Sequence, residues 1–263
     1  MSTSPPLRVV ITGASSGIGA ALARHYARRG ATVALLARRD SALREAAAPF
    51  AAAAALYTCD VRDPHAVRAA ANDFMTQYGC PDIVIANAGI SYGTLTECAE
   101  DYDAFKAVMD VNVCGLVATF QPFIEPMRVA RKGILAGIAS VAGYRGLPGA
   151  EAYCASKAAA ISYLESLRVR LAVDGINVVT INPGYIDTPL TRGNPYPMPF
   201  LLTADAAAEK MARAIDKGAS YTVLPWQMAI VAKLLRVVPN WLYDRVLARA
   251  PHKPRLGSDI TRR

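Results

Sequence analysis

The chain has 263 residues, of which 53% are hydrophobic and 19% are charged. This balance excludes a disordered chain, and the length is sufficient to bury a core without disulfides or structural metals. The formal net charge is +8, but residues 226–263 alone contain eight Lys/Arg and two Asp/Glu, so the excess lies mainly in the tail. A nucleic-acid-binding function for the whole chain is therefore not supported.

The N-terminal sequence enters an apolar segment almost at once and lacks the basic flank and long apolar run of a secretory signal. No stretch approaches the roughly 18 uncharged apolar residues typical of a membrane-spanning helix, so we expect a cytoplasmic protein. The five cysteines are widely spaced without a CxxC pair, and the three histidines are scattered. These spacings predict free thiols and no metal site.

Short β-branched apolar segments alternate with longer amphipathic stretches along the chain. The predicted strands are Leu7–Thr12, Ala31–Ala37, Ala55–Asp60, Asp82–Ala86, Gly133–Ser140, Ile176–Ile181 and Ser220–Leu224. The predicted helices are Gly19–Arg29, Pro64–Tyr78, Tyr102–Phe120, Glu151–Leu171 and Ala204–Lys217. Apolar strands separated by helices are typical of βαβ units with right-handed crossovers. The sequence therefore predicts an α/β fold: a single Rossmann-type doubly wound domain over residues 1–263, with a seven-stranded parallel sheet flanked by helices and a C-terminal helical extension.

A glycine-rich segment, Thr12–Gly19, follows the first predicted strand directly and opens the first helix. Glycine lets the backbone turn tightly and approach a pyrophosphate closely, and a helix N-terminus favours that negative charge. In this position the segment predicts a dinucleotide-binding loop rather than a plain turn. The expected cofactor contacts are Gly13, Ser15, Ser16, Gly17, Ile18 and Gly19.

The end of the second predicted strand indicates which nicotinamide cofactor is used. NAD-binding sites of this type place an acidic residue there against the ribose hydroxyls, but this strand ends in LARR at residues 36–39. Arg38 can make a charge-assisted contact to a 2′-phosphate. The alternative is that Arg38 and Arg39 are solvated loop charges. Because the acid is missing where a base is present, the sequence favours NADP(H).

Ser140 closes the fifth predicted strand, and thirteen residues later the chain reads YCASK from Tyr153 to Lys157. Tyr153 and Lys157 are four residues apart in a helical stretch, so their side chains lie on one face. A free tyrosine has a pKa of about 10, and a neighbouring ammonium favours the phenolate and lowers that pKa. Ser140 can then hydrogen-bond a carbonyl oxygen that Tyr153 protonates as a hydride arrives. Alone, Tyr and Lys at this spacing are usually surface residues.

The sequence resembles the short-chain dehydrogenase/reductase family over roughly residues 7–188. TGASSGIG at 12–19 is similar to the family's TGxxxGxG loop, NAG at 87–89 to its NAG segment, and YCASK at 153–157 to its YxxxK pair. The resemblance implies further cofactor contacts from Asp60 and Val61 at the adenine, from Asn87, Ala88 and Gly89, and from Pro183, Gly184, Ile186 and Thr188 of a PGxxxT segment beside the nicotinamide.

The resemblance also implies what the reacting residues do. It makes Asn112, Ser140, Tyr153 and Lys157 the catalytic set. In that set Asn112 would hold a water for proton relay, and Tyr153 and Lys157 would also contact the cofactor, Lys157 at the nicotinamide ribose. Arg38 would mark an NADP-preferring member.

The sequence is compatible with three functions. The first is an NADPH-dependent oxidoreductase, a carbonyl reductase or alcohol dehydrogenase that moves a hydride between nicotinamide and a carbonyl or hydroxyl carbon of a small molecule. The second is a non-catalytic NADP(H)-binding sensor or scaffold, against which the complete catalytic set argues. The third is a nucleotide-sugar epimerase, which usually has a longer C-terminal domain than the fewer than 80 residues after Thr188. We favour the first, assembled as a homodimer or homotetramer.

Residues 187–217 are expected to form a substrate loop or lid. The segment DTPLTRGNPYPMPFLL at 187–202 contains four prolines, which exclude a regular helix. Apart from Asp187, its only charged residue is Arg192. Its side chains include Tyr196, Met198, Phe200 and Leu201, which favour an apolar or lipid-like substrate over a sugar or a small acid. The alternative is that these side chains pack on the protein itself.

Residues 225–263 are predicted to form a basic amphipathic extension. On a helical projection Lys233, Arg236 and Asn240 share one narrow stripe with apolar residues over the rest, and Pro239 is expected to break or kink the helix. Such an apolar surface must be covered by the domain's own core, by a second subunit or by a lipid interface. The first two are commoner for soluble folds of this kind; peripheral attachment to anionic membranes is the third possibility.

Overall fold

The computed structural model describes residues 5–248 and 251–255. The strands are β1 (Arg8–Thr12), β2 (Thr32–Ala37), β3 (Ala54–Thr58), β4 (Ile83–Ala86), β5 (Gly133–Ile138), β6 (Ile176–Pro183), β7 (Ile186–Asp187), β8 (Leu202–Thr203) and β9 (Tyr221–Leu224). The α-helices are α1 (Gly17–Arg28), α2 (Asp40–Ala47), α3 (Pro64–Tyr78), α4 (Tyr102–Met109), α5 (Gly115–Ala130), α6 (Glu151–Leu171), α7 (Ala204–Asp216), α8 (Trp226–Val237) and α9 (Asn240–Leu247). Short 3-10 turns occupy Ala48–Ala53, Ala99–Asp101, Val141–Gly143 and Ala172–Asp174, and a π-helical turn occupies Asp110–Cys114.

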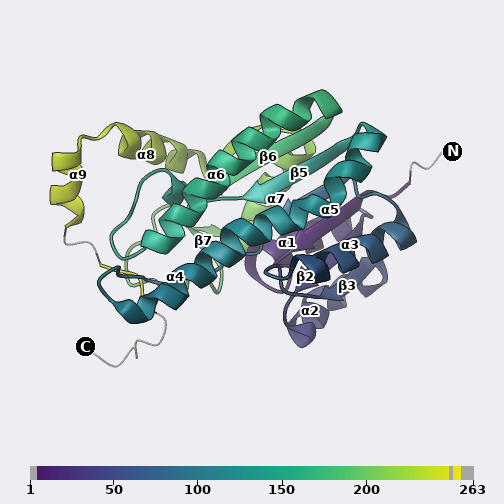
Figure 1. Cartoon of the computed structure of the whole chain (residues 1–263), viewed down its shortest axis with the longest axis horizontal. Coiled ribbons are helices and arrows are strands. Elements are labelled where there is room, and N and C mark those ends of the chain that lie inside the picture. Colours follow the sequence, from purple (N-terminus) through teal and green to yellow (C-terminus); the bar gives the residue numbers. More distant parts are fainter. Residues whose placement is uncertain (1–4, 249–250, 256–263) are drawn as a thin grey trace.

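The main sheet is parallel throughout and follows the order β3-β2-β1-β4-β5-β6-β9 (Figure 1). The chain moves outward from β1 to β3 and then returns to β4 on the other side of β1, so the strand order reverses between β1 and β4. In doubly wound sheets, ligands bind at the carboxyl ends of the strands beside such a reversal. The predicted seven-stranded parallel sheet is confirmed, and β6 runs two residues further than expected.

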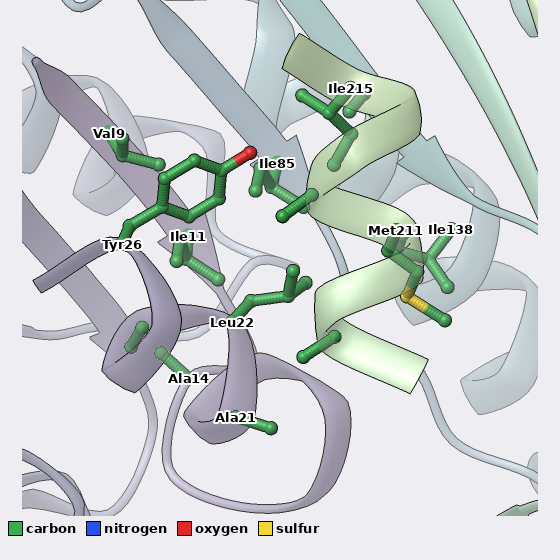
Figure 2. Close-up of a cluster of buried hydrophobic side chains, with 14 of the residues drawn as sticks. Val9, Ile11, Ala14, Ala21, Leu22, Tyr26, Ile85, Ile138, Met211 and Ile215 are labelled. Carbon is green, nitrogen blue, oxygen red and sulfur yellow. The ribbon is translucent and has the colours of Figure 1, made fainter. Parts of the chain in front are cut away.

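Two apolar layers hold helices on the two faces of this sheet. Figure 2 shows the first, in which Leu22 and Tyr26 of α1 and Met211 of α7 lie over Ile11 and Ile85. The second layer joins the opposite face to α3, α5 and α6. The central strands are buried on both faces, which explains why they read as continuous apolar segments rather than alternating ones.

The helix predicted over 102–120 is longer and less regular than expected. It consists of α4, the π-helical turn and α5, which continues past Pro122 and Pro126. Phe120 and Phe123 are fully buried on the sheet. Tertiary packing of this apolar face stabilises the helix where the proline signals alone would end it.

One helical run among the described residues, Ala99–Ala130, is long and apolar enough to cross a membrane by length and composition alone. Half of its most apolar 18-residue window is buried inside the fold. Because α5 covers the sheet here (Figure 1), and the core helix of an α/β domain passes the same test, this run is weak evidence for a membrane span.

The C-terminal half adds two features to the sheet. β7 and β8 pair in parallel and thereby join the two ends of the proline-rich segment 187–202. The predicted C-terminal helices are present, and the expected break at Pro239 separates α8 from α9. Both helices lie at one end of the molecule, away from β1 to β3 (Figure 1).

Candidate active site

A cavity of about 410 Å³ opens at the carboxyl ends of β1, β2, β4, β5 and β6. Most of the residues assigned from the sequence to the cofactor or to catalysis line it: Gly13, Ser15, Ser16, Gly17, Ile18, Arg38, Asp60, Val61, Asn87, Ala88, Gly89, Ser140, Tyr153, Lys157, Pro183, Gly184, Ile186 and Thr188. Gly19 and Asn112 do not belong to this lining. The fold therefore brings segments that are far apart in the sequence to one site.

The glycine-rich loop forms the floor of the cavity between β1 and α1. Gly13 and Gly17 have positive φ angles of 65° and 54°, a region that favours glycine. A Cβ on Gly13 would lie 2.8 Å from Cα of Ala88, and a Cβ on Gly19 would lie 2.3 Å from the carbonyl oxygen of Gly13. The loop is thus a cradle of bare backbone at a helix N-terminus, and the pyrophosphate of a dinucleotide fits it.

Asn87 fixes this loop against the end of β4. Its Nδ2 donates to the carbonyl oxygens of Thr12 at 3.0 Å and Gly13 at 3.2 Å. The hydroxyl of Thr12 in turn accepts from the backbone N–H groups of Asn87 at 3.2 Å and Ala88 at 3.3 Å. These bonds connect the two strands on either side of the reversal, so the loop cannot move independently of β4.

The part of the cavity next to the end of β2 is basic. Arg38 and Arg39 are exposed and both line the cavity. The carboxylate of Asp60, across from them, already accepts from Arg62 at 2.6 Å. This bond is the main reason that the pKa of Asp60 lies below its usual value. The negative charge on this wall is therefore paired, while two guanidinium groups face the cavity.

Ser140 and Tyr153 meet at the opposite end of the cavity. Ser140 follows β5 in an extended conformation, where its Oγ accepts from the backbone N–H of Ala142 at 3.1 Å and donates to the carbonyl of Pro183 at 3.5 Å. Tyr153 lies in the first turn of α6 and hydrogen-bonds to Ser140. Burial raises the pKa of Tyr153 to about 12, and the hydrogen bond with Ser140 offsets only part of this effect.

Lys157 lies one turn further along α6 and is 5% exposed. Its Nζ donates to the carbonyl oxygen of Ile138 at 2.8 Å and lies 5.8 Å from the ring centroid of Tyr153. Burial lowers the pKa of Lys157 to about 8. The expectation that Lys157 depresses the pKa of Tyr153 is therefore wrong for this structure, because desolvation dominates at both residues.

Asn112 lies in the π-helical turn and is buried behind the cavity wall. Its Oδ1 accepts from the backbone N–H of Ile90 at 2.9 Å, and its Nδ2 donates to the carbonyl of Ile90 at 3.0 Å and to Ser156 Oγ at 2.9 Å. A Cβ on Gly89 would approach Asn112 Oδ1 to 3.3 Å and Lys157 Nζ to 3.7 Å. Asn112 thus joins the loop after β4 to α6 within reach of Lys157; a water-holding role stays a prediction.

The cavity lining also contains Pro189, Leu190 and Thr191, which belong to the predicted substrate loop. The lining residues that sequence reasoning did not assign are Leu36, Ala37, Arg39, Cys59, Ile90, Val111, Ile138 and Ala139. Most of them are next to a strand end or next to a residue that was assigned. The rule that ligands bind at the carboxyl ends of parallel strands would have found those near β2 to β5. No local signal identifies Val111, which faces the cavity because α4 and α5 meet there.

The family profile described as short chain dehydrogenase matches residues 8–196. An uncharacterized oxidoreductase of Myxococcus xanthus is 37% identical over 243 residues, which is 91% of this chain and 96% of that protein. The 11-beta-hydroxysteroid dehydrogenase 1A of Arabidopsis thaliana is 39% identical over 189 residues, covering 70% of this chain and 54% of that protein.

Solved structures of short-chain dehydrogenases and ketoreductases have a similar fold. A short-chain dehydrogenase from Streptomyces avermitilis superposes with a TM-score of 0.78 at 25% identity, covering 93% of this chain and 98% of that one. A 3-ketoacyl-(acyl-carrier-protein) reductase from Brucella melitensis complexed with NADH has a TM-score of 0.76, 27% identity and coverage of 83% and 96%. An actinorhodin polyketide ketoreductase with NADPH has a TM-score of 0.76, 26% identity and coverage of 85% and 97%.

The chain belongs to the short-chain dehydrogenase/reductase family. It is an oxidoreductase of that family, which acts on small molecules with a nicotinamide dinucleotide as the cofactor.

Proposed function

We propose that this chain is an NADPH-dependent carbonyl reductase or alcohol dehydrogenase that acts on an apolar or lipid-like substrate. The observation that carries the proposal is that Ser140, Tyr153 and Lys157 line the same cavity as the glycine-rich loop. A nicotinamide bound there supplies the hydride to a carbonyl carbon, or accepts it from a hydroxyl-bearing carbon.

Side chains of the protein transfer the proton. In reduction Tyr153 donates its phenolic proton to the carbonyl oxygen, while Ser140 donates a hydrogen bond to the same oxygen. A pKa of about 12 keeps Tyr153 protonated at neutral pH, as a proton donor requires. Lys157, with a pKa of about 8, is mainly cationic at pH 7, and its Nζ lies 5.8 Å from the ring centroid of Tyr153. In oxidation the same groups act in reverse.

The proposed preference for NADPH is based on Arg38. Arg38 and Arg39 face the cavity beside the end of β2, and Asp60 is already paired with Arg62. A 2′-phosphate would meet two guanidinium groups there, whereas a 2′-hydroxyl would find no carboxylate that is not already engaged. The similar structures include one with NADH and one with NADPH, so the charges of this chain carry the argument.

The proposal of an apolar substrate is based on the segment 187–202. Pro189 and Leu190 line the cavity. The residues named from the sequence do not: Tyr196, Met198, Phe200 and Leu201. Tyr196 is half-buried, with its ring centroid 6.3 Å from that of Tyr185. The only cation of the segment, Arg192, pairs with Asp187 at 3.0 Å, so the segment presents no unpaired charge. The name of the Arabidopsis relative, a hydroxysteroid dehydrogenase, agrees with an apolar substrate.

The test is an assay of the purified protein with NADPH or NADH and a graded panel of ketones and aldehydes, from small polar to long-chain and polycyclic compounds. We expect NADPH oxidation that increases with the apolar size of the substrate. Binding of NADPH without turnover of any compound would favour the sensor or scaffold, and a preference for NADH would contradict the role of Arg38.

A further inference from the structure

The C-terminal segment 251–255 lies beside the catalytic tyrosine and is fixed there from both sides. The backbone N–H of Gly93 donates to the carbonyl of Pro254 at 2.8 Å, and Gly93 forms a parallel bridge with Arg255. A Cβ on Gly93 would lie 2.1 Å from the carbonyl oxygen of Lys253. Arg255 also donates to the buried carboxylate of Asp101 at 2.7 Å. The backbone on both sides of Lys253 is therefore held in place.

Lys253 extends from this segment toward two residues that line the cavity. Its Nζ lies 5.7 Å from the ring centroid of Tyr153 and donates to the carbonyl of Leu190 at 3.4 Å. Leu190 and Tyr153 both line the cavity. Lys253 is not itself a lining residue, but its ammonium lies against these two residues of the cavity wall.

The part of the chain that the structure describes does not balance the charge of Lys253. Within residues 5–248 and 251–255, no carboxylate lies within 4.0 Å of its Nζ, although most neighbouring cations are paired. An ammonium has three donors, and the long bond to Leu190 uses one of them. Burial lowers the pKa of Lys253 to about 8, so the group is mainly charged at pH 7. A partly buried cation without an anion is costly unless a ligand supplies the anion.

We propose that Lys253 binds a carboxylate of the substrate, so that the enzyme takes apolar oxo-carboxylic acids with the acid group a few bonds from the reacting carbonyl. A single ammonium matches a single negative charge, whereas phosphate sites in proteins combine several donors from Arg or backbone N–H groups. This proposal rests on the proposed function and adds a polar end to its apolar substrate.

The experiment compares 4-oxodecanoate with its methyl ester, using NADPH and measuring kcat/KM for wild type and Lys253→Met. We expect wild type to prefer the acid by about 10- to 100-fold, the range of a charge-assisted hydrogen bond. The acid-to-ester ratio of Lys253→Met should fall at least tenfold, mainly through KM, and Lys253→Arg should restore much of it. Lys217→Met, which removes an exposed lysine on α7's C-terminal side, is the matched control.

Two results would overturn the carboxylate site: no preference for the acid in wild type, or an equal loss for acid and ester in Lys253→Met. If other carbonyl compounds are reduced but neither decanoate is, the carboxylate site is wrong while the proposed function survives. If no carbonyl compound is reduced at all, the proposed function itself fails. A preference for the acid that weakens as pH rises past 8, because Lys253 loses its proton, would support the site.

A second, independent feature is the outer face of the C-terminal helices. Only Met228 and Ala232 of α8 are fully buried, so its own domain covers one side alone. The opposite side is exposed and apolar, and α9 continues it: Trp226, Ile230, Leu234, Val237, Trp241, Leu242 and Val246. We name these seven residues the outer apolar face. Trp226 is 67% exposed and Trp241 70%, which is unusual for the largest apolar side chain.

The outer apolar face has a fixed orientation on the domain. Arg145 donates from Nη1 to the carbonyl of Val238 at 2.6 Å and from Nη2 to Asn240 Oδ1 at 2.9 Å, which ties both helices to the loop before α6. On its buried side Met228 lies directly on Gly184, where a Cβ would approach its Cγ to 2.6 Å. The outer apolar face therefore points away from the rest of the molecule. The opposite side of α8 lies against the cavity wall at Gly184.

Basic residues border the outer apolar face. Lys233, Arg236 and Arg245 are exposed on the same two helices, against one acidic residue, Asp244. An apolar face with flanking cations and terminal tryptophans suits the interface of an anionic bilayer. A two-fold contact between two copies would bring two faces of the same net positive charge together, which is unfavourable. We infer that the outer apolar face docks on anionic membranes and brings the cavity close to apolar substrates in the lipid.

The two tryptophans are the only ones in the chain, so tryptophan fluorescence, excited selectively over the twelve tyrosines, reports on this face alone. We expect a blue shift with phosphatidylserine-containing vesicles at low salt, and weaker co-sedimentation with pure phosphatidylcholine or at high salt. The double variant Ile230→Ser/Leu234→Ser should lower vesicle partitioning at least tenfold, since it exposes two polar groups to lipid. Val129→Ser, which changes a 78% exposed side chain on α5, is the matched control.

Vesicle binding with no blue shift, or undiminished binding of the double variant, would overturn the docking surface. A soluble dimer that the double variant splits, without any vesicle binding, would assign the outer apolar face to a second copy of the chain instead.

Discussion

Lys157 donates a hydrogen bond from its ammonium group to the backbone carbonyl of Ile138 at 2.8 Å. Ile138 is the last residue of β5, and Lys157 lies in the second turn of α6. The bond therefore fixes the charged group of the helix against the strand that leads to Ser140. One strand end and one helix start thus position the three side chains proposed to be catalytic, Ser140, Tyr153 and Lys157, so their geometry depends on the packing of α6 rather than on flexible loops.

Tyr153→Phe should lower kcat by at least about a hundredfold, the usual contribution of a positioned proton donor. The ring stays in place because only the hydroxyl is removed, so the affinity for NADPH should change less than about threefold. Steady-state kinetics and NADPH fluorescence titration measure the two effects separately. A variant with more than a tenth of the wild-type kcat would show that another group protonates the carbonyl.

Lys157→Met should abolish turnover and weaken NADPH binding, yet stabilise the fold at neutral pH. Burial lowers the pKa of Lys157 from 10.5 to about 8. Between these two values the unfolded chain holds a proton that the folded chain has lost, so the contribution of Lys157 to the free energy of unfolding rises with pH there. Below pH 8 the wild-type protein carries the full cost of burying the charged ammonium, up to about 3 kcal/mol in the free energy of unfolding. The variant avoids this cost but loses the hydrogen bond to Ile138, which reduces its gain by about 1 kcal/mol.

Urea unfolding of wild type and Lys157→Met at pH 7 and pH 10 tests this sign. The stability advantage of the variant should be largest at pH 7 and shrink toward pH 10. Lys217→Met, at an exposed position, is the matched control. An advantage that grows with pH would contradict the direction of the pKa shift.

Arg38→Asp should move the cofactor preference from NADPH toward NADH by about 2–4 kcal/mol, the scale of a lost charge-assisted contact and a new repulsion. The measurement is the ratio of kcat/KM for the two cofactors. Arg68→Asp, the same change of charge at an exposed position on α3, should leave the ratio unchanged. Equal losses with both cofactors would make Arg38 a structural residue.

The sheet and the glycine-rich loop could be predicted because both follow local rules. A continuous apolar segment such as Ile83–Ala86 fits only a strand covered on both faces. Gly13, Gly17 and Gly19 stand where the backbone needs positive φ or close approach. The position of the reacting residues followed from the spacing of Tyr153 and Lys157 on one helix.

Other features of the site depend on contacts between distant segments, which no local pattern contains. The pKa of Tyr153 is set by burial, and burial depends on every element that surrounds α6. Asn112 does not line the cavity, and Ile90 and Ser156 occupy its amide. Lys253 reaches Tyr153 across a hundred residues of sequence through backbone pairing with Gly93, and its residue type gave no hint of that.

Gly19→Ala tests whether the glycine-rich loop requires space rather than flexibility at this position. A Cβ there would lie 2.3 Å from the carbonyl oxygen of Gly13 and 2.6 Å from Asn87 Nδ2. Asn87 cannot move away without losing its bonds to the carbonyls of Thr12 and Gly13. We therefore expect the loop to shift as a whole, with a loss of about 1–3 kcal/mol in the free energy of unfolding and at least a tenfold loss in NADPH affinity.

Gly146→Ala is the matched control, because no atom lies within 4 Å of its expected Cβ. Its effect on stability should stay within about 0.5 kcal/mol, as for most exposed substitutions. Thermal or urea unfolding gives the stability of both variants, and fluorescence titration gives their NADPH affinity. If Gly19→Ala binds NADPH like wild type, the loop adapts to a methyl group, and the close approach of α1 to β1 is not what shapes the phosphate site. If stability falls while affinity is kept, Gly19 serves helix packing alone, and the cradle depends on Gly13 and Gly17.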